Sequence, residues 1–255
     1  MTYCRPPPEA APDSPDDLRT ETPEPGGSTT AAYAEGMTES AHPLETTEAG
    51  RPPVHAIIVA GGAGSRLAAS APEGTPPKPL LTDDAGHRLI DRVLDACAGC
   101  QTLIVVGPET ELPTGVVRVR ENPPLSGPAA AIGAGVEALA DAGAGEEDLV
   151  LLLAADLTAP HQGVAVLLEH AAGNHGTIGI VGTAGSRLQP LFCLIRFGPL
   201  RRAADTDLRN TSVMRLLRRT GRGNLDTVEL PASTAADVDT WQDALAHGFG
   251  DRNGR

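Results

Sequence analysis

Runs of consecutive apolar residues constrain the fold of this chain more than any other feature. The clearest run is "LVLLLAA", whose residues Leu149 to Ala154 form a predicted strand without a polar side chain. Such a strand must be covered on both faces, and the helices that connect parallel strands supply that cover. The run therefore predicts a buried, mostly parallel sheet between two layers of helices.

Other apolar runs alternate with segments that have the periodicity of helices. Further strands are predicted at 56–60, 102–106, 116–120, 177–181 and 189–195. The segments "RLIDRVLDACAG", "GPAAAIGAGVEALADAG" and "QGVAVLLEHAAG" have apolar residues three and four apart and end in glycine, as helices do. The fold class is therefore α/β, a three-layer α/β/α domain with a mostly parallel, Rossmann-like sheet. In such sheets ligands bind outside the carboxyl ends of the strands.

The beginning of the chain has a different composition. Residues 1–52 are rich in proline, serine and threonine and hold ten acids against three arginines, so they carry −7 of the total charge of −13. They are predicted to be a disordered acidic tail, and 53–250 the folded domain. We find neither the apolar stretch of a secretory signal nor about 20 apolar residues for a membrane span, so a cytoplasmic protein without membrane contact is expected.

A glycine-rich turn follows the first predicted strand. In "IIVAGGAGSRL" the strand ends at Ala60, and Gly61, Gly62, Ala63, Gly64 and Ser65 lead into a helix. Bare backbone N–H groups at such a place bind anions or nucleotides, although a tight turn also needs glycine for conformational reasons alone. A dinucleotide fingerprint would need a third glycine where Leu67 stands and an acid after the second strand. A Walker loop would need G-K-[ST], which is absent.

Two cations and a carboxylate complete the candidate catalytic group. Lys78, the only lysine of the chain, stands between prolines in "PPKPL", and Arg66 follows the glycine turn, so both are predicted to contact phosphate. Asp156 follows the strand "LVLLLAA" and is a predicted ligand of Mg²⁺, which would separate it from a bound phosphate. The alternatives are a solvated loop lysine and a helix cap, a role for which Thr158 lies nearer to the helix after Pro160.

Six segments, taken in order, resemble the MobA-type nucleotidyltransferases, specifically the molybdenum cofactor guanylyltransferases. They are "IVAGGAGSRL", "PPKPLL", "ENPPLSGPAAAIGAG", "LLAADLTAP", "LQPLFCLIR" and "DVDTWQDAL". The resemblance implies a nucleotidyltransferase fold and Mg²⁺-dependent transfer of GMP from GTP to the terminal phosphate of molybdopterin. It also implies transient contact with proteins that insert the molybdenum cofactor.

The resemblance assigns roles to individual residues. The turn from Ala60 to Gly62, with Gly64 and Ser65, would bind GTP, Lys78 would contact its phosphates and Asp156 would bind magnesium. Gly127 and Asn122, or Glu121 in place of Asn122, lie in a segment that is near the nucleotide in the family. Asp237 is a second, weaker candidate for the metal, whereas Asp239 is expected to cap the helix that follows it.

Some motifs depart from that family. The usual R-M-G-x-D-K is replaced by "RLAASAPEGTPPK", and Gly107 and Pro108 stand where some members have an asparagine. The loop also resembles the G-G-x-G-T-R-L and P-K-P-L signature of sugar-phosphate nucleotidyltransferases. Another small nucleotidyltransferase, of sugar-phosphate or cytidylyl type, and a non-catalytic nucleotide- or pterin-binding protein therefore stay as alternatives.

The remaining features of the sequence indicate less about its function. The acidic charge and 2% of aromatic residues argue against nucleic acid as a partner. Cys97 and Cys100 form a C-x-x-C pair without a second pair, which favours packing over redox or zinc roles. Seven arginines cluster between 196 and 219, and Arg209 or Arg215 is a candidate for holding the pterin phosphate.

Overall fold

The structure, a computed structural model, describes residues 51–62, 64–174, 176–221 and 225–250. They belong to one compact unit, Glu48–Arg255. The predicted tail lies outside the described residues except for Arg51 and Pro52, so its disorder stays a prediction. No helix in the described part of the chain is long and apolar enough to cross a membrane.

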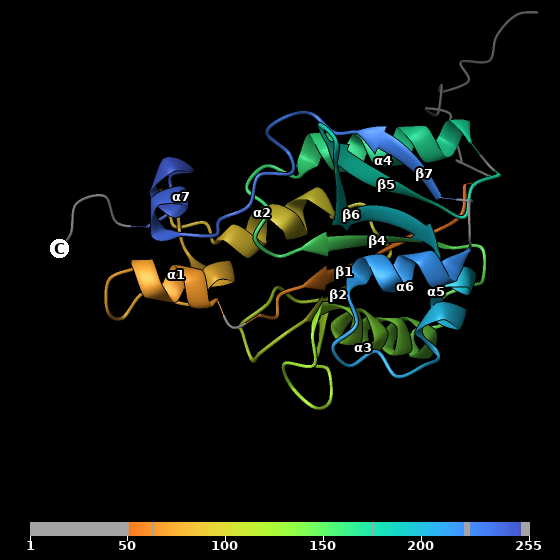
Figure 1. The fold of residues 1–255 in the computed structure, drawn as a ribbon, viewed down its shortest axis with the longest axis horizontal. Helices are drawn as coiled ribbons and strands as arrows, with labels where there is room; N and C mark the ends of the chain where they lie inside the picture. The colour runs from red at the N-terminus through yellow and green to blue at the C-terminus, as the bar shows by residue number, and fades with distance from the viewer. Residues whose placement is uncertain (1–50, 63, 175, 222–224, 251–255) are drawn as a thin grey trace, which may run out of the picture. The chain divides into compact units, whose positions relative to one another are not determined.

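Strands and helices alternate through most of the domain (Figure 1). In chain order the elements are β1 (Val54–Val59), α1 (Ser65–Ser70), the 3-10 helix η1 (Lys78–Leu80), α2 (Leu89–Ala96), β2 (Thr102–Val106), β3 (Val116–Val119), α3 (Pro128–Asp141), β4 (Leu149–Ala154), α4 (His161–Gly173), β5 (Gly179–Ala184), β6 (Arg187–Arg196), α5 (Phe197–Ala204), α6 (Val213–Thr220), β7 (Leu225–Glu229) and α7 (Trp241–Ala246). All six predicted strands and the three predicted helices are present.

Strand β1 begins at Val54, two residues before its predicted start, but the largest differences from prediction lie at the end of the sheet that contains β5, β6 and β7. The predicted strand 177–181 begins two residues later, at Gly179, and 189–195 extends from Arg187 to Arg196. These two strands pair as a hairpin whose tight turn contains Gly185 with φ of +57°. Strand β7 was not predicted. It lies at the edge of the sheet and keeps a polar sequence, "LDTVE", that lacks the apolar signal of the inner strands.

The described residues form a seven-stranded sheet in the order β3-β2-β1-β4-β6-β5-β7. Strand β6 pairs antiparallel with both neighbours, while the other pairs are parallel. Helices α3, α5 and α6 cover one face and α2 and α4 cover the other (Figure 1). The prediction of a three-layer α/β/α domain with a mostly parallel sheet is therefore confirmed.

The core consists of one apolar layer on each face of the sheet and a third cluster beyond its edge. Alternate residues of β1 divide between the two layers: Ile57 packs under α3, and Ile58 packs under α2 and α4. The third cluster joins α1 to α7 at the carboxyl ends of the strands, and its buried members are Leu67, Leu81, Leu89, Val238, Ala244 and Phe249. This cluster holds together two chain segments, 66–89 and 237–249, which carry Arg66, Lys78, Asp237 and Asp239.

Candidate active site

The glycine turn lies where the sequence places it, at the carboxyl end of β1. Ala60 still donates its N–H to Val106 of β2 at 2.8 Å, and Gly61 and Gly62 follow as exposed backbone. Gly62 has φ of +141°, and Gly64, the residue before α1, has φ of +55°, conformations that side chains disfavour. Helix α1 begins at Ser65 and is only six residues long. A bound anion would therefore interact mainly with the bare backbone of the turn and less with the dipole of a long helix.

Lys78 lies at the centre of the charged group. Its ammonium is 2.5 Å from Asp156 Oδ2 and 3.3 Å from Asp239 Oδ1, and its side chain is 15% exposed. Burial lowers the pKa of this lysine, but the two carboxylates outweigh burial and the net pKa lies above its ordinary value. Lys78 is therefore charged at neutral pH. Its predicted contact with phosphate over the glycine turn stays a prediction.

Two chain segments far apart in sequence bring the carboxylates together. Thr158 hydrogen-bonds Ala236 O through both its backbone N–H (3.0 Å) and its hydroxyl (3.2 Å), and Leu157 forms an isolated β-bridge with Asp237. Asp156 and Asp237 consequently come near each other. The expectation that Thr158 caps α4 is wrong, because its hydroxyl is used in this connection and α4 begins after Pro160 without a side-chain cap.

Asp239 has a role that the sequence did not indicate. The expectation that Asp239 caps α7 is wrong, because the cap is Thr240, whose hydroxyl accepts from Asp243 N while Asp243 accepts from Thr240 N. Asp239 is thereby left to contact Lys78 and Arg66, whose Nη1 lies 2.6 Å from Asp239 Oδ2. The T-x-x-D spacing of Thr240 and Asp243 is the signal that could have identified the cap and shown that Asp239 is available for another role.

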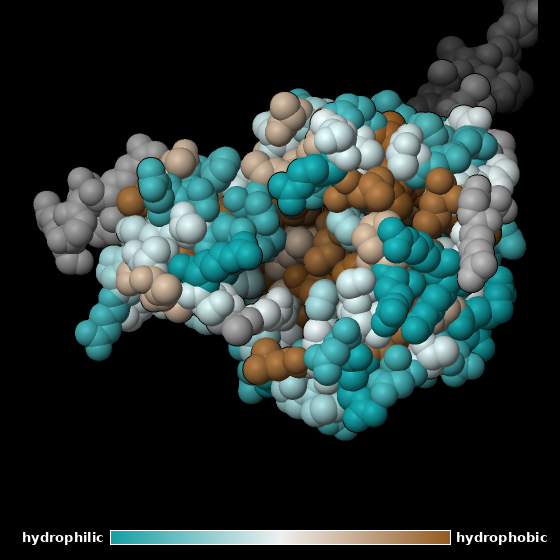
Figure 2. Space-filling view, viewed as in Figure 1, coloured by the Kyte–Doolittle hydropathy of each residue, from teal (hydrophilic) through white to brown (hydrophobic). Residues whose placement is uncertain are grey.

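The charge of this group is unbalanced. Two cations, Arg66 and Lys78, face three carboxylates, those of Asp156, Asp237 and Asp239. Partial burial and the neighbouring Asp156 and Asp239 raise the pKa of Asp237 above its ordinary value. Strands β1 and β4 point toward the α1–α7 side of the domain (Figure 1), and Figure 2 shows the surface hollowed between that side and the end of the sheet.

The residues present fit Mg²⁺ in one particular way. Among the described residues no three His, Cys, Asp or Glu side chains form a metal-binding group. Mg²⁺ typically takes one or two carboxylates and completes its shell with phosphate oxygens and waters. Asp156 and Asp237 meet that requirement when a phosphate-bearing ligand supplies further oxygens.

A second loop, Glu121–Gly127, follows β3 and comes near the glycine turn at Glu121. Glu121 is buried, with 7% of its surface exposed, and its Oε1 accepts from Leu125 N at 2.8 Å. Asn122 is exposed, and Gly127, with φ of +100°, precedes α3. Gly107 also belongs here, because a methyl group on it would stand 3.0–3.1 Å from Ala60 and displace the end of β2 from the turn.

The other predicted residues lie elsewhere. Arg209 pairs with Asp207, two residues away on the surface, at 2.7 Å, and Arg215 is exposed on α6. Cys97 is buried in the core, as packing predicts, and Cys100 is a free thiol whose backbone N–H donates to Cys97 O at 2.8 Å. Neither arginine forms a described contact with the residues of the charged group.

Comparison with known proteins identifies the family of this chain. Residues 56–224 match the family model of the MobA-like NTP transferase domain. The chain belongs to this family. The match spans β1 to α6 and so includes the glycine turn, Lys78 and Asp156, while the segment with Asp237 and Asp239 lies beyond it. As a MobA-like NTP transferase, the protein is a nucleotidyltransferase. No curated protein matches the chain.

Solved structures share the fold of this MobA-like domain at low sequence identity. A nucleotidyl transferase from Methanothermobacter thermautotroptrophicus is 20% identical with a TM-score of 0.59, covering 77% of this chain and 96% of its own. A 2-C-methyl-D-erythritol 4-phosphate cytidylyltransferase from Francisella tularensis is 16% identical with a TM-score of 0.55, covering 76% and 97%. A molybdopterin-guanine dinucleotide biosynthesis protein A from Archaeoglobus fulgidus is 14% identical with a TM-score of 0.52, covering 76% and 96%. At these identities the likeness establishes the fold and does not choose between guanylyl and cytidylyl transfer.

Proposed function

We propose that this MobA-like nucleotidyltransferase transfers GMP from GTP to the terminal phosphate of a molybdopterin-type cofactor and releases pyrophosphate. The observation that supports the proposal most directly is the group of Lys78, Asp156, Asp237 and Asp239 beside the bare glycine turn. Phosphoryl transfer needs positioning and charge neutralisation more than a protein nucleophile. With Arg66, this group supplies two cations and the carboxylates that would bind a metal.

The reaction proceeds by displacement at the α-phosphorus of GTP. An oxygen of the cofactor's phosphate forms the new P–O bond, and the bond from the α-phosphorus to the bridging oxygen of the β-phosphate breaks. Pyrophosphate carries away the electron pair. The backbone of Gly61 and Gly62 binds the nucleotide, and Lys78 exchanges its carboxylate partners for phosphate oxygens. Arg66, released from Asp239, adds a second cation at the turn.

Mg²⁺ fits this scheme as a bound cation. Asp156 and Asp237 would hold it together with phosphate oxygens, and it would supply charge neutralisation at the triphosphate. The excess of carboxylate over cationic side chains in the group favours a divalent cation there. A protein that acts on GTP and pterin also needs a phosphate-binding cation for the acceptor, for which Arg209 and Arg215 stay candidates.

Another nucleotidyltransferase reaction is the second candidate. The "PPKPLL" loop resembles the sugar-phosphate enzymes, and a cytidylyltransferase shares the fold. Non-catalytic binding is the third reading. The experiment that separates them measures pyrophosphate release from GTP, CTP, UTP and dTTP with Mg²⁺, with molybdopterin or sugar phosphates as acceptors. Release only with GTP and molybdopterin supports the proposal. Release with dTTP and a sugar phosphate contradicts it, and binding without release supports the non-catalytic reading.

A further inference from the structure

Glu121 has a carboxylate oxygen that nothing described in the structure satisfies. The side chain is 7% exposed, and Oε1 accepts from Leu125 N at 2.8 Å. Its Oε2 is enclosed and has no hydrogen-bond partner among the described residues. A buried, unpaired carboxylate oxygen is costly, and few native groups are left in that state without a reason. Glu121 is therefore a candidate for a residue that meets its partner only when a ligand binds.

The carboxylate lies directly behind the glycine turn. A methyl group built on Gly61 would stand 4.0 Å from Glu121 Oε1, and no other non-neighbouring atom would lie within 4 Å of it. Because glycine has no side chain, nothing of Gly61 separates the turn from the carboxylate. The next residue along the loop, Asn122, is exposed. A nucleotide on the turn would thus place its base or ribose near Glu121.

The chemistry of a carboxylate selects among the bases. A carboxylate accepts two parallel N–H groups. Guanine presents such a pair, N1–H beside the 2-amino group. Adenine and cytosine place an acceptor nitrogen beside their amino group, and uracil and thymine flank N3–H with carbonyl oxygens, so each of these edges sets an acceptor against one carboxylate oxygen. We propose that the Glu121 carboxylate recognises guanine through N1–H and the 2-amino group. The inference rests on the proposed function and identifies what selects its nucleotide.

Reaching Oε2 requires a small movement of the Glu121–Gly127 loop. The loop is suited to this movement at Leu125, which is 65% exposed and has φ of +62°, a conformation that leucine disfavours. Its N–H is held by the same carboxylate. Contact between the base and Glu121 therefore exchanges a local hydrogen bond and a strained turn for the contacts of the ligand.

The test compares purine triphosphates that differ only at position 2. Equilibrium binding of GTP, ITP and XTP to the full chain with Mg²⁺ is measured by calorimetry for wild type, Glu121→Gln and Glu169→Gln. ITP lacks the 2-amino group, and the loss of a hydrogen bond to a charged group should weaken wild-type binding about tenfold to a hundredfold. In Glu121→Gln that preference disappears, and XTP gains relative to GTP because the amide N–H₂ can donate to the 2-oxo group. Glu169, exposed on α4, is the matched control and keeps the wild-type ratios.

The outcomes separate this inference from the proposed function. If Glu121→Gln binds all three nucleotides in the wild-type ratios, Glu121 only positions the loop and the inference is overturned. If Glu121→Gln does not fold, the wild-type ratio decides alone, and equal binding of GTP and ITP overturns the inference. If the discrimination is present but no pyrophosphate is released, GMP transfer fails while the inference stands. A wild type that binds no triphosphate overturns both.

Discussion

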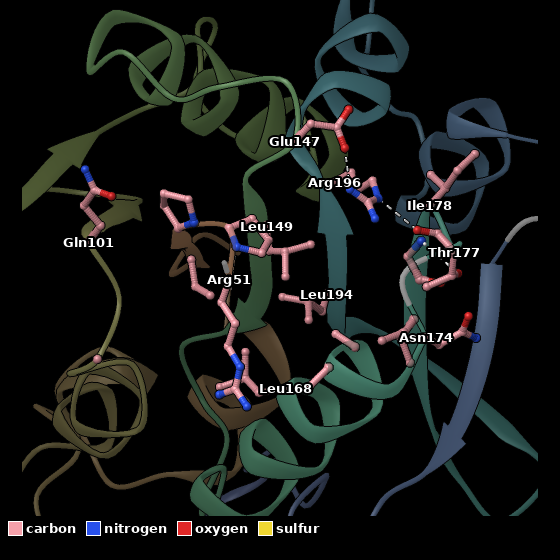
Figure 3. Close-up of a pocket in the computed structure, with 18 residues that line it drawn as sticks. Arg51, Gln101, Glu147, Leu149, Leu168, Asn174, Thr177, Ile178, Leu194 and Arg196 are labelled. Atoms are coloured by element: carbon pink, nitrogen blue, oxygen red, sulfur yellow. Dashed lines mark hydrogen bonds and ion pairs between the residues drawn. The ribbon is translucent and has the colours of Figure 1, made fainter. Parts of the chain in front are cut away.

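The amino ends and the carboxyl ends of the parallel strands, here called the amino edge and the carboxyl edge of the sheet, carry charged side chains in different arrangements. At the amino edge, a cavity of about 850 Å³ is lined by Leu149, Leu168 and Leu194 and by the ion pair of Arg196 with Glu147 at 2.5 Å (Figure 3). At the carboxyl edge, Lys78 is shared between Asp156 and Asp239. This cavity therefore lies at the opposite ends of the strands from the charged group, and cavity volume is a poor guide to the chemistry of this protein.

The two groups differ in their balance of charge. At the amino edge Asp148 Oδ2 lies 3.0 Å from His55 Nε2 and accepts from Gly145 N at 2.7 Å, while His55 Nδ1 is buried without a hydrogen-bond partner among the described residues. At the carboxyl edge, three carboxylates share two cations, and like charges near each other destabilise the folded state. Structural ion pairs are closed, whereas an excess of one charge is maintained where a charged ligand is to bind.

Removing the charge of Asp156 should lower turnover more than any other change at the carboxyl edge. Asp156→Asn keeps the shape of the side chain but removes a charge, so turnover should fall by about a hundredfold or more while the fold survives. Steady-state pyrophosphate release at saturating Mg²⁺ measures the first effect, and thermal unfolding measures the second. Wild-type rates in this variant would mean that Asp156 only pairs with Lys78.

Arg66 should matter less, because its side chain is 76% exposed. We expect Arg66→Gln to lower turnover about tenfold at low salt, and the deficit should shrink as ionic strength rises, since solvent and salt screen an exposed charge. The measurement is the turnover ratio of variant to wild type at about 0.05 and 0.5 M salt. A deficit as large and as salt-independent as that of Asp156→Asn would place Arg66 deeper in the chemistry than its exposure indicates.

The inner part of the fold was predictable, because each inner strand carries its own signal. Strand β4 is apolar at every position and β2 nearly so, and no contact distant in sequence is needed to recognise them. The edge strand β7 was missed because "LDTVE" becomes a strand only by pairing with β5. Local periodicity does not record such pairing.

The residues of the candidate site also divide into those that the sequence could predict and those that it could not. The glycine turn, Lys78 and Asp156 follow predicted strands or stiff proline segments, so their neighbourhood could be inferred from parallel topology. The role of Asp239 could not, because it depends on a contact across 161 positions of sequence with Lys78. The unpaired oxygen of Glu121 was equally hidden, since burial of a loop residue is a property of packing and not of its own sequence.

A methyl group at Gly61 should change the choice of base. The backbone φ of Gly61 lies outside the left-handed region, so alanine is tolerated there, and its methyl would contact the Glu121 carboxylate at 4.0 Å. We expect Gly61→Ala to weaken GTP use and improve CTP use, shifting their ratio of kcat/KM about three- to tenfold. Gly64→Ala is the control: with φ of +55° it should lower stability without altering the ratio. Equal use of CTP and GTP by the wild type would contradict the guanylyl assignment itself.

At the amino edge we expect a substitution to lower stability and leave turnover unchanged. Asp148→Asn weakens the bond with buried His55, which should cost about 1–3 kcal/mol and lower the melting temperature by about 2–4 °C for each kcal/mol. Turnover at a temperature well below the transition should be unchanged, because no residue of the candidate site contacts Asp148. A variant that melts normally but turns over slowly would show that the two edges are coupled.

Deletion of residues 1–50 should have the smallest effect of all. The segment lacks apolar periodicity and carries many acids and prolines, so little apolar surface is available for it to bury against a domain. The described strand β1 begins at Val54, and its neighbour Pro53 O accepts from Leu149 N, so the deletion leaves the first pairing of the sheet intact. We therefore expect the melting temperature and the rate of pyrophosphate release to match those of the full chain. A loss of several degrees would show that the segment docks on the folded domain, and changed release at an unchanged melting temperature would show that it acts on the site.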